Sequence, residues 1–482
     1  MWPSSPPGGA PPSRALPRAA ASAGTSAPAR PAGPCSAASA AGPVPEPRPP
    51  APQGPRSPVR LRLYAWVTGL VLGSLDAILA LRIAVGPDAG GPWTTSPLAV
   101  VLLMCGSAAV GSAAGAPILR RLGVRMAGVG ADLLLIAGAL LAVLPGARID
   151  AALALGVALA GLGSGLLLLV APQVCHELSL PGHRRLMPQA IALVPVGAAL
   201  GVMGSWWLAR SLTAGWLGVV AVALAHLGVV LVLPPSPVWL TGRGRDIEAF
   251  AALRGLHGTL EAAVAIDWAR HEAGMAAEQQ PLTLADLRVR GIRRAAGAAA
   301  VLVIAQEAPL GAAAIILAPA IVLILGGSGA QVAVSAVGWL LIAALALLLG
   351  GTATRRRFIA VMLGVSLAVI ASTLLVALTA VSGRAALWLA VIPLVVVAGA
   401  QHALVLPACQ GAVDPRVPPW LVGAQRRMVA VGRSVVRIPA LAIPLAVLER
   451  GGPGVMAWVF FALAVASVVV VMARLPRELG AP

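Results

Sequence analysis

Runs of about 20 apolar residues recur along the chain from Leu61 onward, and this feature limits the possible folds more than any other. A helix of that length crosses roughly 30 Å of hydrocarbon. A soluble domain carries about 25% charged residues, whereas only 11% of these 482 residues are charged and 59% are hydrophobic. That much apolar surface cannot be hidden in one or two soluble cores. The sequence therefore predicts a membrane protein with many spans.

Twelve such runs occur, six before and six after a polar stretch of about 60 residues. The run from Ala295 to Gly327 is too long for one straight span, and Pro309 and Pro319 predict a break or a kink within it. The runs lie near residues 61–85, 97–119, 126–146, 151–172, 188–209, 213–234, 297–319, 330–350, 358–381, 385–407, 428–448 and 453–473.

The composition between the runs predicts the domain boundaries. The first 58 residues are rich in Pro, Ala, Ser, Gly and Arg, which predicts a disordered cytoplasmic tail. Within the polar stretch, Ile247–Leu256 and Leu282–Arg290 predict short amphipathic helices, the second with a weak capping signal at Thr283. We expect a tail at 1–58, six helices at 59–234, a central loop at 235–294, six helices at 295–474 and a short tail at 475–482.

Arginine accounts for the whole of the basic charge, because the chain contains no Lys, and the net charge is +18. The arginines gather in the central loop and in the loops after the second, fourth, eighth and tenth runs. Cytoplasmic loops of membrane proteins carry such an excess of positive charge. We therefore expect both termini and the central loop in the cytoplasm, with the lipid bilayer rather than nucleic acid as the partner. The sequence does not distinguish the plasma membrane from the internal membranes.

The four cysteines are scattered, and neither a metal-binding spacing nor a Ser-His-Asp arrangement occurs. We expect no metal, no cofactor and no enzymatic activity.

Two segments resemble signatures of the sugar porter branch of the major facilitator superfamily. Residues 234–258, PPSPVWLTGRGRDIEAFAALRGLHG, resemble the family's PESPRWL signature and the GR…EA…L…LRG helix after it, with Val238 in place of the Arg. Residues 171–184, APQVCHELSLPGHR, are similar to the family's AP-x-Y-x-x-E-x-A-P-x-x-x-R pattern, with Glu177 and Arg184 at matching positions. Six helices, a long central loop and six more helices are also the layout of this superfamily.

The resemblance implies an all-α membrane protein with 12 transmembrane helices in two six-helix bundles. Such a protein moves a hexose, a polyol or a similar small polar solute by alternating access. Three departures bear on that function. Arg120 stands where the family has a loop Asp, Gly351 stands in the repeat of that position, and Val157 replaces the Arg of span 4. They keep open a second hypothesis, a protein that lost transport and serves a structural, regulatory or envelope role.

Ionisable and polar side chains at membrane depth are the candidate site residues, because burying them is costly. Asp76 matches the family's proton-coupling carboxylate, so protons are a candidate partner; with Val157 in place of the cation, a neutral, hydrogen-bonded Asp76 is the favoured alternative. Gln306 and Glu307 lie beside Pro309 in span 7 and are candidate substrate contacts. Trp388 is a third candidate, although its place near a helix end is also typical of an aromatic belt.

A cytoplasmic gate is the other candidate site, and the resemblance implies that it is built from charges. Glu177 is expected to cluster with the arginines of the next loop. The candidate gate residues are Glu177, Arg184, Arg120, Arg121, Arg355 and Arg356.

Five more ionisable side chains have no assigned function. Asp132 is expected to be an interfacial carboxylate paired with Arg125 or the next loop, and His226 and His402 to be packed residues. Arg433 and Arg437, one turn apart in span 11, must reach a water-filled cavity or the membrane surface.

Overall fold

The computed structural model describes residues 58–85, 96–143, 150–180, 186–207, 212–278, 284–324, 329–380, 384–409 and 421–478. Helices make up nearly all of these residues, and no strand occurs among them. The predicted N-terminal tail lies outside them except for Pro58, as does Thr283. The elements are α1 (Val59–Val85), α2 (Pro97–Val143), α3 (Asp150–Leu178), α4 (Leu186–Trp207), α5 (Leu212–Val232), α6 (Pro237–Thr241), α7 (Asp246–His257), α8 (Thr259–Glu278), η1 (Leu284–Arg288), α9 (Arg290–Glu307), α10 (Gly311–Ile324), α11 (Gly329–Arg355), α12 (Arg357–Thr379), α13 (Arg384–Gly399), η2 (Ala400–Val405), α14 (Leu406–Cys409) and α15 (Val422–Glu478).

Helix α2 is two membrane spans joined by a reversal at Gly123. Its 47 residues are too long for one crossing, and Gly123 has φ 76° and ψ 166°, a conformation that is essentially restricted to glycine. Before Gly123, α2 packs alongside α3 in the same direction, because Ala108 meets Gly165 and Gly115 meets Leu169. After it, the direction is opposite, because Ala131 meets Gly163 and Gly138 meets Ala160.

Helix α15 also contains two spans. It has 57 residues, and its regular geometry breaks at Gly452, where φ is 73°. Ten helical stretches of the described residues are long and apolar enough to cross a membrane, and the merged stretches of α2 and α15 are among them. Because α2 and α15 each contain two crossings, the described residues contain 12, in agreement with the predicted all-α membrane fold.

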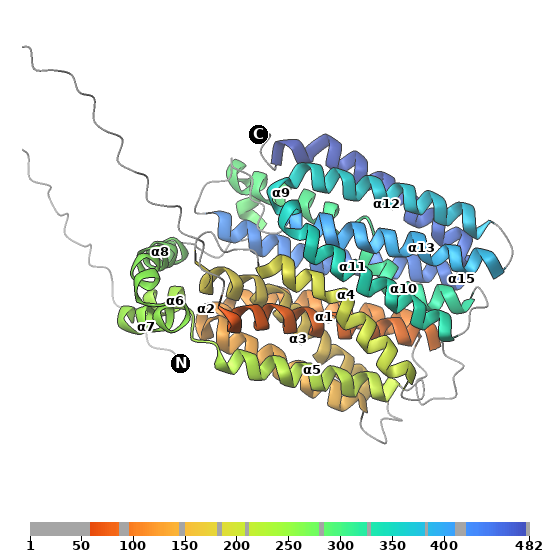
Figure 1. The fold of residues 1–482 in the computed structure, drawn as a ribbon. Coiled ribbons are helices and arrows are strands. Elements are labelled where there is room, and N and C mark those ends of the chain that lie inside the picture. The colour runs from red at the N-terminus through yellow and green to blue at the C-terminus, as the bar shows by residue number, and fades with distance from the viewer. Residues whose placement is uncertain are drawn as a thin grey trace, which may run out of the picture. The chain divides into compact units, whose positions relative to one another are not determined.

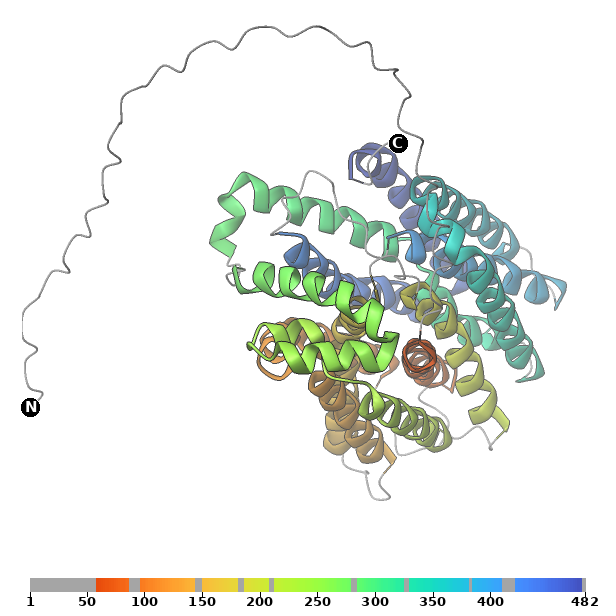
Figure 2. The same ribbon diagram turned by 60° about the vertical axis from the view of Figure 1, so that its left-hand side comes forward.

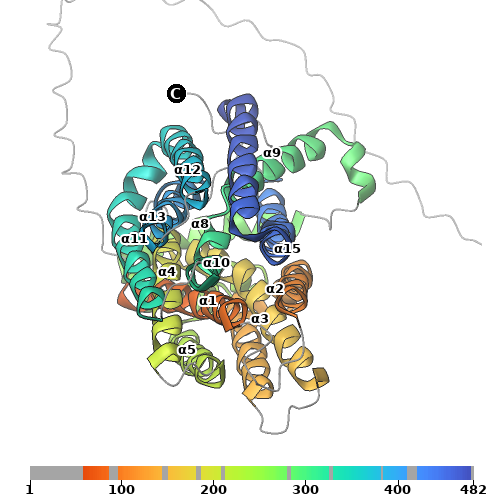
Figure 3. The same cartoon turned by 90° about the vertical axis from the view of Figure 1, so that its right-hand side faces the viewer.

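The spans form two bundles that meet along a seam. Helices α1 to α5 pack around one another, and the later spans pack around α12 and α15. Across the seam, α1 contacts α10, α4 contacts α11, and α2 contacts α15. The end-on view in Figure 3 separates the two groups, with α10 beside α1, and Figure 1 shows the spans running side by side along their length.

Small residues allow the closest approaches within the first bundle. A Cβ on Gly165 of α3 would lie 1.8 Å from the Ala108 carbonyl oxygen of α2. Contacts this close between helices need glycine, and dense packing of this kind holds helices together in lipid, where no hydrophobic driving force acts between them.

Span 7 is broken, as the proline pattern predicts. Helix α9 ends at Glu307, and α10 begins at Gly311, so the break falls at Pro309. Leu310 takes a positive φ of 59° between the two helices. Pro319 lies inside α10 without ending it. Span 10 is irregular too, because the π-helical turn η2 separates α13 from α14.

The central loop folds into three helices at one end of the bundles, visible in Figures 1 and 2. Helix α7 confirms the predicted helix at Ile247–Leu256, and the second predicted helix is reduced to the 3-10 turn η1. Helix α8 was not predicted. Helices α6, α7 and α8 together form a three-helix cap on the bundles. They share a small core that includes Leu240, Leu253 and Ile266.

Candidate functional site

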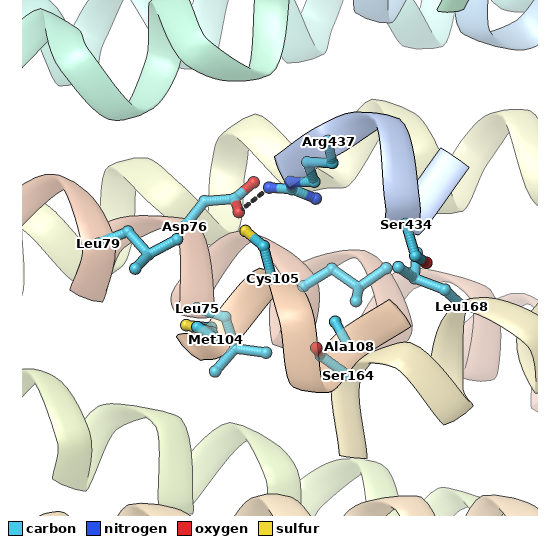
Figure 4. A pocket seen from close by; sticks show the side chains of 11 residues that line it. Leu75, Asp76, Leu79, Met104, Cys105, Ala108, Ser164, Leu168, Ser434 and Arg437 are labelled. Atoms are coloured by element: carbon cyan, nitrogen blue, oxygen red, sulfur yellow. Dashed lines mark hydrogen bonds and ion pairs between the residues drawn. The ribbon is translucent and has the colours of Figure 1, made fainter. Parts of the chain in front are cut away.

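An ion pair joins the two bundles. Asp76 of α1 accepts a short hydrogen bond from Nη2 of Arg437 of α15, and the exposed fractions of the two side chains are 7% and 20%. Figure 4 shows the carboxylate and the guanidinium joined by a dashed line in the wall of a pocket that both residues line. The prediction of an Asp76 without a cation is therefore wrong. Val157 removes the expected partner on α3, but α15 supplies another from the opposite bundle.

A second ion pair lies one helical turn away on α15. Arg433 Nε donates to Glu307 Oε1 of α9 over 2.6 Å, and the Glu307 side chain is 2% exposed. Because Arg433 and Arg437 are four residues apart, they share one face of α15 and reach two different helices. The sequence predicted that Arg433 and Arg437 reach a water-filled cavity or the membrane surface. In the structure each guanidinium pairs with a carboxylate, because an unpaired charge in lipid is costly.

The seam also carries a neutral contact next to the ion pairs. The hydroxyls of Ser112 of α2 and Ser434 of α15 are 2.8 Å apart, and Ser112 also donates to the Gly165 carbonyl oxygen. A small cavity lies between these groups and the Asp76–Arg437 pair (Figure 4). Its lining is mostly apolar and includes Leu72, Leu75, Leu79, Met104, Cys105, Ala108, Ser164 and Leu168.

Buried amides lie beside the break in span 7 and on α15. Gln306 is 1% exposed, and its Oε1 has no hydrogen-bond partner within the described part of the chain. Gln401 of η2 accepts a short hydrogen bond from the Gly311 backbone N–H at the start of α10. Gln425 of α15 is fully buried. The side chain of Trp388 lies outside the described residues.

At the predicted gate, Glu177 meets hydroxyl and amide groups. It accepts a short hydrogen bond from the Ser236 hydroxyl and one of 2.6 Å from Nε2 of Gln173. Ser236 also caps α6, because its hydroxyl oxygen accepts from the Trp239 backbone N–H at 3.0 Å. Glu177 therefore ties the end of α3 to the three-helix cap. Arg184, the expected partner of Glu177, lies outside the described residues.

The other predicted gate arginines do not gather around Glu177. Arg120 and Arg121 are exposed at the end of the first span of α2, and the Arg121 carbonyl oxygen accepts from Arg243 Nη2 at 3.3 Å. Arg356 is exposed and precedes α12, and the side chain of Arg355 is not described. In the cap, the Arg245 guanidinium donates to Glu248 and holds the pKa of that carboxyl below its usual value.

A second buried polar cluster lies inside the first bundle. Asp132 of α2 is fully buried, and Nδ1 of His226 of α5 lies 2.8 Å from Asp132 Oδ1. The prediction of an interfacial Asp132 paired with Arg125 is therefore wrong. Arg125 instead donates to the Leu231 carbonyl oxygen over 2.6 Å. His402 is packed, with Nδ1 3.0 Å from the Ala398 carbonyl oxygen.

The sequence contained part of the information needed to predict the two ion pairs of Arg433 and Arg437. Two arginines one turn apart in an apolar helix require carboxylates elsewhere at membrane depth, and Asp76 and Glu307 are among the few acidic residues in the spans. Counting those charges would have suggested the pairs. Gln401 offered no comparable signal.

The fold and the site define a class of protein: a multi-pass membrane protein whose two bundles enclose paired charges at their seam. The comparisons agree with it. The model of the family described as "Sugar (and other) transporter" matches residues 84–411, more than half of the chain. A search of curated proteins gave no match.

Solved structures share the fold at low sequence identity. The proton:xylose symporter XylE bound to 6-bromo-6-deoxy-D-glucose is 17% identical with a TM-score of 0.70, over 87% of this chain and 98% of that one. The xylose transporter XylE from E. coli in a partially occluded, inward-open conformation is 16% identical with a TM-score of 0.67, over 88% and 99%. A POT family transporter in complex with 5-aminolevulinic acid is 14% identical with a TM-score of 0.55, over 87% and 96%.

The protein has the fold of the major facilitator superfamily. The chain belongs to the sugar (and other) transporter family within it. This family consists of transporters and is not a class of enzymes.

Proposed function

We propose that the protein moves a neutral, small polar solute, a hexose or a polyol, by alternating access at the seam between the two bundles. The observation that carries this proposal is the contact of Asp76 with Arg437, because it joins the bundles beside a cavity. In such transporters, one bundle rocks against the other around a fixed central site.

The charges at the seam support a neutral solute. Asp76 and Glu307 oppose Arg433 and Arg437, so the four side chains carry no net charge. A solute that bears a net charge would leave one charge uncompensated in a water-poor site, which is costly. Hydroxyl groups, in contrast, can donate to the carboxylates and accept from the guanidinium groups.

Gln306 is the best-placed substrate contact of the predicted residues. Its carbonyl oxygen is buried without a partner in the described part of the chain, and a hydroxyl of the solute would satisfy it. Glu307 would affect the binding of the solute through its ion pair with Arg433. Trp388 remains a proposed stacking residue.

The same geometry supports proton coupling through Asp76. A proton that binds to the carboxylate removes its charge, so the attraction to Arg437 across the seam falls. Protonation would therefore favour separation of α1 from α15, and release of the proton would favour their approach. The XylE structures are of a protein named as a proton:xylose symporter.

The proposed orientation has both termini and the three-helix cap in the cytoplasm. The cap lies beside the cationic loop after the second span, because Arg243 donates to the Arg121 carbonyl oxygen. We keep the predicted boundaries of 59–234 for the first bundle and 295–474 for the second. Glu177 and its hydrogen bonds to Ser236 and Gln173 would then act as a cytoplasmic gate.

Uptake of radiolabelled hexoses and polyols into a transport-deficient cell tests the proposal, with and without an imposed pH gradient. We expect saturable uptake of one class, increased by inward proton flow. The variant Asp76→Asn should lose the response to the gradient, whereas Asp267→Asn, which changes an exposed carboxylate of the cap, should keep it.

The absence of uptake by protein that reaches the membrane and remains folded would refute transport and favour the structural or regulatory alternative. Uptake with an unchanged gradient response in Asp76→Asn would refute proton coupling alone.

A further inference from the structure

A carboxylate, an imidazole and a hydroxyl from three different spans meet inside the first bundle. His226 Nδ1 lies 2.8 Å from Asp132 Oδ1, and His226 Nε2 lies 2.9 Å from the hydroxyl oxygen of Thr68 of α1. All three side chains are fully buried. The seam cavity is lined by other residues, so the cluster is separate from the proposed transport site.

The hydrogen bonds of Thr68 suit two protonation states of the cluster. The Thr68 hydroxyl lies 2.9 Å from His226 Nε2 and 2.7 Å from the Tyr64 carbonyl oxygen. An ionised Asp132 can only accept, so the proton of a neutral imidazole is on Nδ1, and Thr68 donates to Nε2. When Nε2 carries a second proton, it donates to Thr68, and the Thr68 hydrogen turns to the Tyr64 carbonyl oxygen.

Neither state leaves a polar atom of the cluster unsatisfied. A rotation of one hydroxyl hydrogen exchanges the two arrangements, and no heavy atom has to move. An added proton normally costs a buried site one lost hydrogen bond or one uncompensated charge. Here the proton on Nε2 faces the hydroxyl oxygen, and the Asp132 carboxylate balances the imidazolium charge.

A second small cavity leads toward this cluster from the end of the bundle that carries the cap. It is lined by Arg125, Leu233 and Pro234 and reaches Tyr64. The Tyr64 ring lies 5.1 Å from the His226 ring, between centroids. The Tyr64 hydroxyl is buried and has no hydrogen-bond partner among the described residues. A hydroxyl in that position can hold a water molecule or pass a proton.

Few other titratable groups face the cluster. Tyr64 of α1 and Cys175 of α3 lie close to the cluster, and both side chains are buried. Arg125 of α2 lies at the outer end of the cavity and donates to a backbone carbonyl. Helix α4 contains no ionisable residue. The balance of charge within the cluster therefore rests on Asp132 and His226.

We infer that Asp132, His226 and Thr68 form a binding site for one proton inside the N-terminal bundle, which exchanges with water on the side of the cap. The proton comes from water and forms an N–H bond at His226 Nε2, and its release reverses the step. This site goes beyond the proposed transport site, where Asp76 is the proton acceptor.

The test is nuclear magnetic resonance of the full-length protein, labelled with ¹⁵N-histidine and held in lipid nanodiscs, over the pH range in which it stays folded. The chain has six histidines, and the variant His226→Gln identifies the relevant signal. A variant that keeps His226 as its only histidine identifies it if His226→Gln does not fold. We expect Nε2 of His226 to gain a proton as the pH falls.

Thr68 provides the readout that a purely structural cluster would not give. Thr68→Val removes a hydrogen bond from both states, and the bond from the charged imidazolium is the stronger of the two. The midpoint should therefore fall by about one pH unit, a tenfold loss of proton affinity. Thr68→Ser should restore it. His402→Gln, which removes a buried histidine of the other bundle, should leave it unchanged.

The inference is overturned if His226 keeps one protonation state throughout, or if Thr68→Val leaves the midpoint in place. These outcomes do not depend on transport, so they are distinct from a failure of the proposed function.

Discussion

The ion pair across the seam gives the sharpest energetic prediction. Arg437→Gln leaves the Asp76 carboxylate, whose side chain is 7% exposed, without its cation. Asp76→Asn leaves the guanidinium of Arg437 without its anion. Removal of one partner from a buried pair costs roughly 3–5 kcal/mol. Because the Arg437 side chain is 20% exposed, water screens part of its charge, and we expect about 3 kcal/mol for either change.

The double variant Asp76→Asn with Arg437→Gln separates pairing from packing. Its two amides can bond to each other, and no unpaired charge remains. We therefore expect it to be more stable than the sum of the single losses predicts, by a coupling energy of at least roughly 1 kcal/mol. The assay is unfolding of the purified protein by denaturing detergent in mixed micelles, which gives the free energy of unfolding for each member of the cycle.

A matched control comes from the cap. Arg245 and Glu248 form an ion pair in which the side chains are 49% and 53% exposed, and exposed pairs contribute little. The same cycle on these residues should give no measurable coupling. Additive losses at Asp76 and Arg437, within about 0.5 kcal/mol, would show that the two side chains do not interact across the seam and would refute the reasoning.

Three further predictions test the fold and the gate. Gly123→Ala forces a side chain into a glycine-only conformation, 3.1 Å from the Trp239 ring, and should destabilise the protein by about 1–3 kcal/mol in the same unfolding assay. Gly165→Leu should separate α2 from α3 and lower the yield of folded protein on size-exclusion chromatography, whereas the same change at Gly130, which has open space around its Cβ position, should not. Glu177→Ala frees Ser236 and should increase labelling of a cysteine placed on α6 by a membrane-impermeant reagent from the cytoplasmic side; unchanged labelling would argue against a gate.

The local pattern of the sequence was enough to predict the helices. Apolar runs predicted the spans because each must satisfy its own backbone in lipid, and Pro309 predicted the break in span 7. The reversal at Gly123 also falls in a predicted loop between two runs. Helix α8 was missed because its apolar residues are mostly alanine, which gives only a faint periodic pattern.

The site could be predicted only in part, because it depends on contacts between distant residues. Asp76 and Arg437 are 361 positions apart, and Asp132 and His226 are 94 apart. The resemblance to sugar porters placed the expected cation at position 157, where this chain has Val. It gave no indication of a cation on α15. Whether a buried acid finds its cation on a neighbouring span or across the seam depends on helix packing, which no local pattern encodes.

The central claim is that the two bundles move against each other around the seam, and a reversible cross-link tests it most directly. The hydroxyls of Ser112 and Ser434 are 2.8 Å apart, so cysteines at both positions should form a disulfide in a background without the native cysteines. We predict that oxidation stops uptake in the double-cysteine variant, that reduction restores it, and that neither single variant responds. Full uptake by the cross-linked protein would contradict the account.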